Sequence, residues 1–152
     1  MKNIYFVQVD VSASSETQNA YLPYTAGILV ASAFTSEIVK ENCLFKEFIF
    51  LREDVNAIVE RLDNPSFMGF SCYCWSTEYN KLLAKAVKEK YPDCLVVFGG
   101  HDIPDNFSML EEFDYIDVLC HGEGEDTTRE LLEAYCQSKA FDDVNNISFR
   151  NN

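Results

Sequence analysis

Short apolar segments alternate with helix-like segments along the whole chain, and this alternation limits the possible folds more than any other feature. The strand-like segments are rich in β-branched and aromatic residues and lie at 3–9, 45–51, 66–73, 94–100 and 116–120. Between them, apolar residues recur at helical spacing, most clearly at 53–62, 76–91 and 127–135. The pattern predicts an α/β fold: a Rossmann-like or flavodoxin-like, doubly wound domain in which a parallel five-stranded sheet lies between two helix layers (α/β/α).

The chain length of 152 residues fits one domain with a sizeable core. Residues 1–140 carry the alternating pattern and are predicted to form the ligand-binding unit. Residues 141–152 are predicted to begin a linker or an extra strand.

The formal net charge of −13 excludes two classes of partner. A nucleic-acid backbone or an anionic membrane would be repelled over most of such a surface. The first residues, 1–11, contain Gln8 and Asp10 and are too short and too polar for a signal peptide or a membrane span. We therefore expect a cytoplasmic protein that binds neither nucleic acid nor membrane.

The cysteines are expected to be free thiols, mostly small core residues, because no export signal is present. Cys72 and Cys74 form a C-x-C pair, and no Cys-x-x-x-Cys-x-x-Cys motif occurs, so we expect no iron–sulfur cluster in this segment. One alternative stays open, a Cys–His hydrolase that would use Cys72 or Cys120 with His101.

Small residues lie at or just after the carboxyl ends of three predicted strands, where ligands of doubly wound folds bind. They are Ser71 and Cys72, Gly99 and Gly100, and Gly122 and Gly124. Glycine permits close approach of the backbone to a bulky ligand, although each glycine alone is also explained by a tight turn.

The stretch HGEGEDTTRELL, 121–132, joins the last of these exits to a helix. We expect one of Glu123 and Glu125 to hold the loop and the other to favour the helix N-terminus. Thr127 with Glu130 is predicted to form a capping box, and Ser76 to cap the helix that follows it. No set of matched histidine and cysteine ligands accompanies the carboxylates, so we expect no metal site in the protein itself.

Four motifs together resemble the N-terminal cobalamin-binding domain of B12-dependent radical SAM enzymes, a family that includes proteins similar to the anaerobic magnesium-protoporphyrin IX monomethyl ester cyclase. The motifs are YLPYTAG at 21–27, S-x-Y-x-W at 71–75, GG-H at 99–101 and D-x-x-x-x-GEGE at 117–125. The resemblance spans nearly the whole chain.

The resemblance implies a domain that holds cobalamin at the carboxyl ends of the strands, facing a radical SAM barrel. The residues that it assigns to the cofactor are Pro23, Ser71, Cys72, Tyr73, Trp75, Gly99, Gly100, His101, Gly122, Glu123, Gly124 and Glu125. Trp75 would pack on the corrin or the dimethylbenzimidazole, or is simply a rim aromatic. The iron–sulfur cluster and SAM would belong to a missing downstream domain, so this segment is not expected to be catalytic alone. Substituting Gly122 or Gly124 by valine is expected to abolish cofactor binding without unfolding the domain.

Two departures from related domains qualify this expectation. The D-x-H-x-x-G signature that supplies a cobalt-ligating histidine in methionine-synthase-type domains is absent. Where H-x-x-G does occur, from His121 to Gly124, Leu119 stands in the aspartate position. The radical SAM cysteine motif is also absent, which favours an excised domain or a truncated relative.

Two other interpretations remain open. Ser12 to Thr17 loosely resembles the hydroxyl-rich phosphate loop of flavodoxins, so an FMN electron carrier is one alternative. The other is an interaction module that kept the fold and lost the ligand. A phosphorylated receiver domain is excluded because Ser71 to Tyr73 and Cys120-His121 stand where its aspartate and lysine are required.

Overall fold

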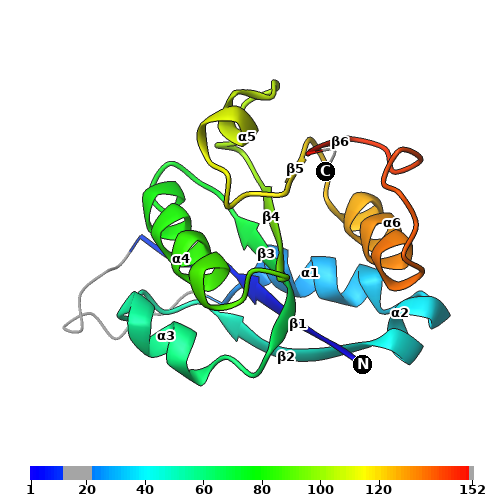
Figure 1. The fold of residues 1–152 in the computed structure, drawn as a ribbon, viewed down its shortest axis with the longest axis horizontal. Helices are drawn as coiled ribbons and strands as arrows, with labels where there is room; N and C mark the ends of the chain where they lie inside the picture. The colour runs from blue at the N-terminus through cyan, green and yellow to red at the C-terminus, as the bar shows by residue number, and fades with distance from the viewer. Residues whose placement is uncertain (12–21, 151–152) are drawn as a thin grey trace.

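A single six-stranded sheet runs through the computed structural model, which describes residues 1–11 and 22–150 (Figure 1). The strand order is β2-β1-β3-β4-β5-β6. The strands are β1 (Lys2–Val7), β2 (Cys43–Ile49), β3 (Pro65–Ser71), β4 (Leu95–Gly99), β5 (Val118–Cys120) and β6 (Ile147–Phe149).

The first five strands pair in parallel, which confirms the predicted sheet. The expected count of five strands is extended by β6, which pairs antiparallel with β5 through Val118 opposite Phe149. A strand at this position was one of the two expectations for residues 141–152. The chain can return antiparallel here because no crossover helix follows α6, so β6 covers the open edge of β5.

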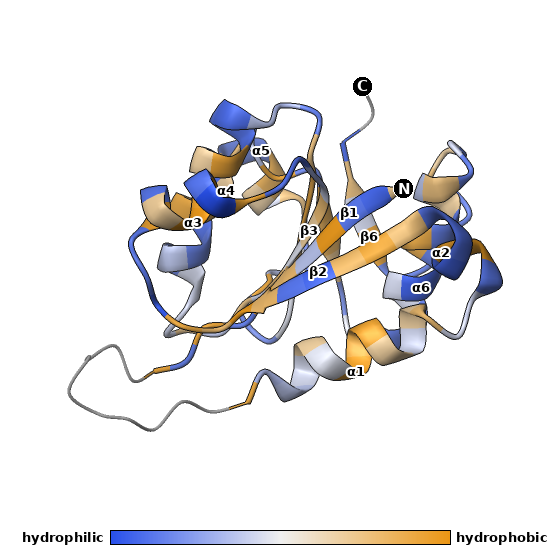
Figure 2. Cartoon of the chain, turned by 90° about the horizontal axis from the view of Figure 1, so that it is seen from below, coloured by the Kyte–Doolittle hydropathy of each residue, from blue (hydrophilic) through white to orange (hydrophobic). Residues whose placement is uncertain are grey.

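The helices are α1 (Tyr24–Ala33), α2 (Glu37–Asn42), α3 (Val55–Arg61), α4 (Thr77–Lys90), α5 (Ser108–Glu112) and α6 (Glu125–Cys136). Figure 2 shows α3, α4 and α5 on one side of the sheet and α1, α2 and α6 on the other. None of the helices in the described part of the chain is long and apolar enough to cross a membrane.

The alternation of side chains along β1 shows how the sheet separates the core into two halves. Tyr5 and Val7 point into the core beneath α3 and α4, whereas Ile4 and Phe6 point into the core beneath α1 and α6. All four residues are buried, as expected for a strand covered on both faces.

One of the two predicted helix caps is confirmed in position. Ser76 is the N-cap residue of α4, but its hydroxyl makes no capping hydrogen bond and instead accepts from the Tyr73 N–H (3.0 Å). The predicted capping box is wrong, because α6 begins at Glu125 with Gly124 as its N-cap. Thr127 therefore lies inside the helix, where it is buried and its hydroxyl donates to the carbonyl of Glu123.

Candidate functional site

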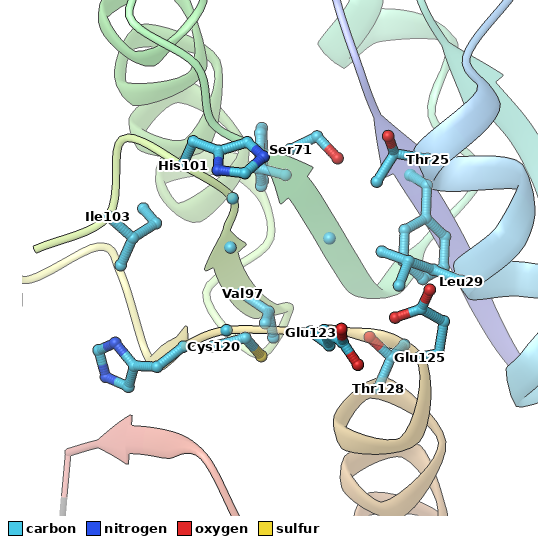
Figure 3. Close-up of a pocket in the computed structure, with 18 of the residues that line it drawn as sticks. Thr25, Leu29, Ser71, Val97, His101, Ile103, Cys120, Glu123, Glu125 and Thr128 are labelled. Atoms are coloured by element: carbon cyan, nitrogen blue, oxygen red, sulfur yellow. The ribbon is translucent and has the colours of Figure 1, made fainter. Parts of the chain in front are cut away.

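A cavity of about 600 Å³ opens at the carboxyl ends of the parallel strands, between the sheet and helices α1 and α6. We call it the strand-end cavity. Figure 3 shows Thr25 and Leu29 of α1, Thr128 of α6 and Val97 of β4 directed towards the same space. Doubly wound folds bind ligands at this edge, so the cavity lies where the predicted topology places a site.

The floor of the strand-end cavity is made by side chains from four neighbouring strands, Phe6, Phe67, Val97 and Cys120. The sequence identified only Cys120 among them as a functional candidate, and that was for the hydrolase alternative. Gly69 lies among them, and a Cβ atom there would come within 2.8 Å of the Phe6 ring. Any larger residue at this position would therefore move Phe6 or fill the floor. In the sequence, the feature that indicated an open space here was Gly69, a glycine inside an otherwise apolar strand.

The glycines at the rim are required for two different reasons. Gly100 has φ +117°, and a Cβ atom there would lie 2.5 Å from the carbonyl oxygen of Cys72. Gly124 borders α1, and a Cβ atom there would lie 2.9 Å from Cδ2 of Leu29. Gly122 has φ +68° but faces open space. The first glycine thus serves the fold of the rim, whereas the second leaves room at the cavity wall.

Acidic side chains line the cavity mouth. Glu123, Glu125 and Asp105 are among its lining residues, and none of the described lining residues is lysine or arginine. Glu125 lies in the first turn of α6, as predicted, where its charge stabilises the helix N-terminus. The structure records no hydrogen bond to the carboxylate of Glu123 from the described residues. The hydroxyl of Thr127 donates to the backbone carbonyl of Glu123 and holds the loop there instead.

An aromatic cluster stands beside the cavity. The rings of Tyr73 and Trp75 are stacked with centroids 4.8 Å apart and an interplanar angle of 1°, and the His101 ring lies 5.7 Å from Tyr73. The hydroxyl of Tyr73 also contacts the Thr25 hydroxyl of α1 at 3.3 Å. Trp75 is 43% exposed and borders a smaller neighbouring hollow, together with Leu22, instead of the strand-end cavity.

Two polar residues that sequence reasoning missed hold the turn carrying these aromatics. Arg52 donates from Nη2 to the carbonyl of Trp75 (2.6 Å), and its guanidinium lies over the Tyr79 ring. Asn80 is fully buried and donates from Nδ2 to the carbonyl of Ser71 (3.0 Å). The only sequence signal for Asn80 was a polar residue on the apolar face of a helix.

The structure gathers most of the predicted cofactor residues around one cavity. Those that line it are Ser71, Tyr73, Gly99, Gly100, His101, Gly122, Glu123, Gly124 and Glu125. Cys72 is instead buried under α4, where Asn80 contacts its sulfur, and Pro23 is the N-cap of α1 and does not line the cavity.

The cysteines are all unpaired, as predicted, and four of them are buried. Burial raises the pKa of the Cys72 and Cys120 thiols to about 12. Both thiols are therefore protonated near neutral pH, which argues against the Cys–His hydrolase. Among the described residues no group of three or more histidine, cysteine or carboxylate side chains is placed to hold a metal ion.

No family model matches the chain. It is 36% identical over 132 residues to the cobalamin-dependent radical SAM methyltransferase TokK of Streptomyces tokunonensis, across 86% of this chain and 18% of TokK. It is 37% identical over 113 residues to the 2-(S-pantetheinyl)-carbapenam-3-carboxylate methyltransferase of Streptantibioticus cattleyicolor, across 74% of this chain and 17% of that enzyme. The chain is related to one region of cobalamin-dependent radical SAM methyltransferases. It spans less than a fifth of the length of these curated relatives.

Solved structures of such a methyltransferase share the fold. Two structures of TsrM from Kitasatospora setae match 99% of this chain and 29% of TsrM. The structure with tryptophan and a SAM analogue bound gives a TM-score of 0.69 at 16% identity. The structure with cobalamin and a [4Fe-4S] cluster bound gives 0.67 at 17% identity. The likeness to the magnesium-protoporphyrin cyclase rests on the sequence motifs alone.

Proposed function

We propose that this chain is the cobalamin-binding part of a B12-dependent radical SAM methyltransferase. The corrin would lie across the carboxyl ends of the strands, and the nucleotide tail would enter the strand-end cavity. The observation that carries this proposal is a deep apolar cavity, kept open by Gly69 and Gly124, in a chain related to cobalamin-dependent enzymes.

The floor of the cavity suits a flat apolar ring. Its volume of about 600 Å³ lies within the range of small-molecule sites. Phe6, Phe67 and Val97 offer an apolar surface on which the dimethylbenzimidazole of the tail would be buried. A residue larger than glycine at position 69 would occupy part of the cavity. The presence of glycine there supports a binding role for the cavity floor.

The rim suits the amide fringe of a corrin. Corrin amides are neutral hydrogen-bond donors, and Glu123, Glu125 and Asp105 provide carboxylate acceptors at the cavity mouth. The glycine loops allow the ligand to approach the backbone closely. The same acidic mouth, without a described lysine or arginine, would repel the doubly charged phosphate of FMN more strongly than the singly charged phosphodiester in the nucleotide tail of cobalamin. The flavodoxin-like loop, Ser12 to Thr17, lies outside the described residues.

The stacked Tyr73–Trp75 pair offers a flat apolar surface next to the cavity mouth. A corrin ring is broad enough to cover both the mouth and this pair, so Trp75 would pack against the corrin and not against the buried tail. Arg52 and Asn80 would then act as positioning residues, because they hold the backbone of the turn that bears Trp75.

The remaining parts of the reaction belong to a longer protein. Bound cobalamin supplies methyl-transfer chemistry, whereas the SAM-binding barrel and the iron–sulfur cluster would lie in a domain outside this chain. We assign no catalytic residue to the segment. The two curated relatives are methyltransferases, which favours methyl transfer over the cyclase-type reaction that the motifs also suggested.

A visible-spectrum titration with hydroxocobalamin, run beside one with FMN, tests the proposal. We expect a saturable shift of the corrin bands with the wild-type chain and a large loss of affinity in Val97→Phe, which fills the cavity floor. Leu44→Phe is the matched control, because Leu44 is 44% exposed on the edge strand β2. Saturable binding of FMN alone would favour the flavodoxin interpretation, and binding of neither would favour an interaction module.

A further inference from the structure

Two cysteines lie side by side far from the strand-end cavity. The Sγ atoms of Cys43 and Cys136 are 3.3 Å apart, although the residues are separated by 93 positions in the sequence. Cys43 begins β2 and Cys136 ends α6, so the pair joins the amino-terminal edge of the sheet to the last turn of that helix (Figure 1). A disulfide needs an S–S distance of about 2.05 Å, so the two sulfurs need to close by only about 1.3 Å.

The two thiols differ in accessibility, which sets an order for reaction with an external oxidant. Cys136 is partly exposed, whereas Cys43 is 1% exposed. Burial first, and then the neighbouring Cys136 thiol, raise the pKa of Cys43 to about 12. An oxidant would therefore meet Cys136 first, and Cys43 would react afterwards from within the protein.

We propose that Cys43 and Cys136 form a reversible disulfide by exchange with low-molecular-weight disulfides of the glutathione class. The thiolate of Cys136 attacks one sulfur of the small disulfide, which forms a mixed disulfide and releases one small thiol. Cys43 then loses its proton and attacks the Cys136 sulfur, which forms the intramolecular bond and releases the second small thiol. The protein dithiol is oxidised by two electrons, and the small disulfide is reduced to two thiols.

The bond would fasten α6 to the sheet at the end opposite the cavity. Helix α6 packs beside α1, and its first turn carries Glu125 of the cavity mouth. A crosslink across 93 positions restricts the unfolded chain strongly, so oxidation is expected to raise the thermal midpoint. In a reducing compartment, a disulfide of this kind would be transient or redox-sensing. This inference does not depend on which cofactor the cavity binds.

The test uses the 152-residue chain carrying Cys74→Ser, because Cys74 is exposed and would react separately. The protein is incubated in glutathione buffers of increasing oxidised fraction, quenched with acid, alkylated and analysed by intact and peptide mass. We expect a peptide that links Cys43 to Cys136, a rise in thermal midpoint of about 5 °C or more, and faster exchange at higher pH. Reduction should reverse all of these changes.

Cys94→Ser is the matched control, since Cys94 is buried and its sulfur is recorded in a hydrogen bond with the carbonyl of Leu95 and not with another cysteine of the described residues. It should leave the crosslink in place, whereas Cys43→Ser and Cys136→Ser should each remove it. If both thiols stay open to alkylation in unfolded, quenched samples, the proposal is wrong. A glutathione adduct on Cys136 that never resolves into the Cys43 bond would overturn it equally.

Discussion

Gly100→Ala should destabilise the protein because the added methyl group meets backbone atoms. The Cβ atom would lie 2.5 Å from the carbonyl oxygen and 2.9 Å from the nitrogen of Cys72. That backbone is itself fixed, because the Cys72 N–H donates to the Gly99 carbonyl (2.7 Å) and the Cys72 carbonyl accepts from Asp102 (3.2 Å). The loop after β4 and the turn after β3 therefore cannot separate without losing hydrogen bonds.

The magnitude follows from two costs and one gain. The positive φ of +117° is unfavourable for alanine by about 1–2 kcal/mol. Relieving the overlap with Cys72 costs about 1–3 kcal/mol more. Alanine restricts the unfolded chain, which returns about 0.4–1 kcal/mol. The net loss is about 1–4.5 kcal/mol, or a fall in thermal midpoint of roughly 2–18 °C.

Thermal and urea denaturation followed by circular dichroism measure this loss. Gly27→Ala is the control, because Gly27 lies inside α1 with nothing within 4 Å of the added Cβ atom. The control should raise the free energy of unfolding by about 0.5–1 kcal/mol, the usual gain of alanine over glycine in a helix. A Gly100→Ala protein as stable as wild type would refute the assignment of this glycine to a backbone contact.

Three further predictions follow from the site and the core. Arg52→Lys should weaken the hydrogen bond to the Trp75 carbonyl and shift the tryptophan fluorescence, with little loss of stability. A fluorescence spectrum identical to that of the wild type, both with and without cobalamin, would contradict the assignment of Arg52 as a positioning residue. Gly124→Val should press on Leu29 and lower cobalamin affinity at least tenfold while the circular dichroism spectrum stays native; unchanged affinity would remove Gly124 from the site. The pKa values of the Cys72, Cys94 and Cys120 thiols are raised by burial from 9.0 to about 12, so the unfolded chain loses these protons first as the pH rises. The contribution of these thiols to the free energy of unfolding should therefore be fully present below pH 9 and should decrease above it by up to about 1.4 kcal/mol per thiol per pH unit. Urea midpoints that do not change between pH 8 and pH 10 would disprove this.

The sequence predicted the parallel sheet and the edge at which the site lies, for a physical reason. Buried strands and amphipathic helices leave periodic patterns, and glycines such as Gly99 and Gly100 mark where the strands end. The cavity was expected there because parallel strands bring their carboxyl ends together. The short helix α2 left no such pattern, since its six residues give less than two turns of periodicity.

The depth of the cavity and the place of Trp75 were not predictable from the sequence. The floor depends on how the Phe6 and Phe67 rings pack around Gly69, and periodicity does not show which gap between side chains stays open. Trp75 lies outside the cavity because three contacts fix its turn: Ser76 and Asn80 donate to the carbonyl of Ser71, and Arg52 donates to the carbonyl of Trp75. The Arg52 contact joins residues 23 positions apart and therefore leaves no local signal in the sequence.

The central claim is that the strand-end cavity receives the nucleotide tail of cobalamin. The most direct measurement compares the dissociation constants of cobalamin and cobinamide, the corrin that lacks this tail, for the wild-type chain. Burial of the apolar ring against Phe6 and Val97 predicts that cobalamin binds at least about tenfold more tightly, and that Val97→Phe removes the difference. Equal dissociation constants for the two corrins in the wild-type chain would contradict the account.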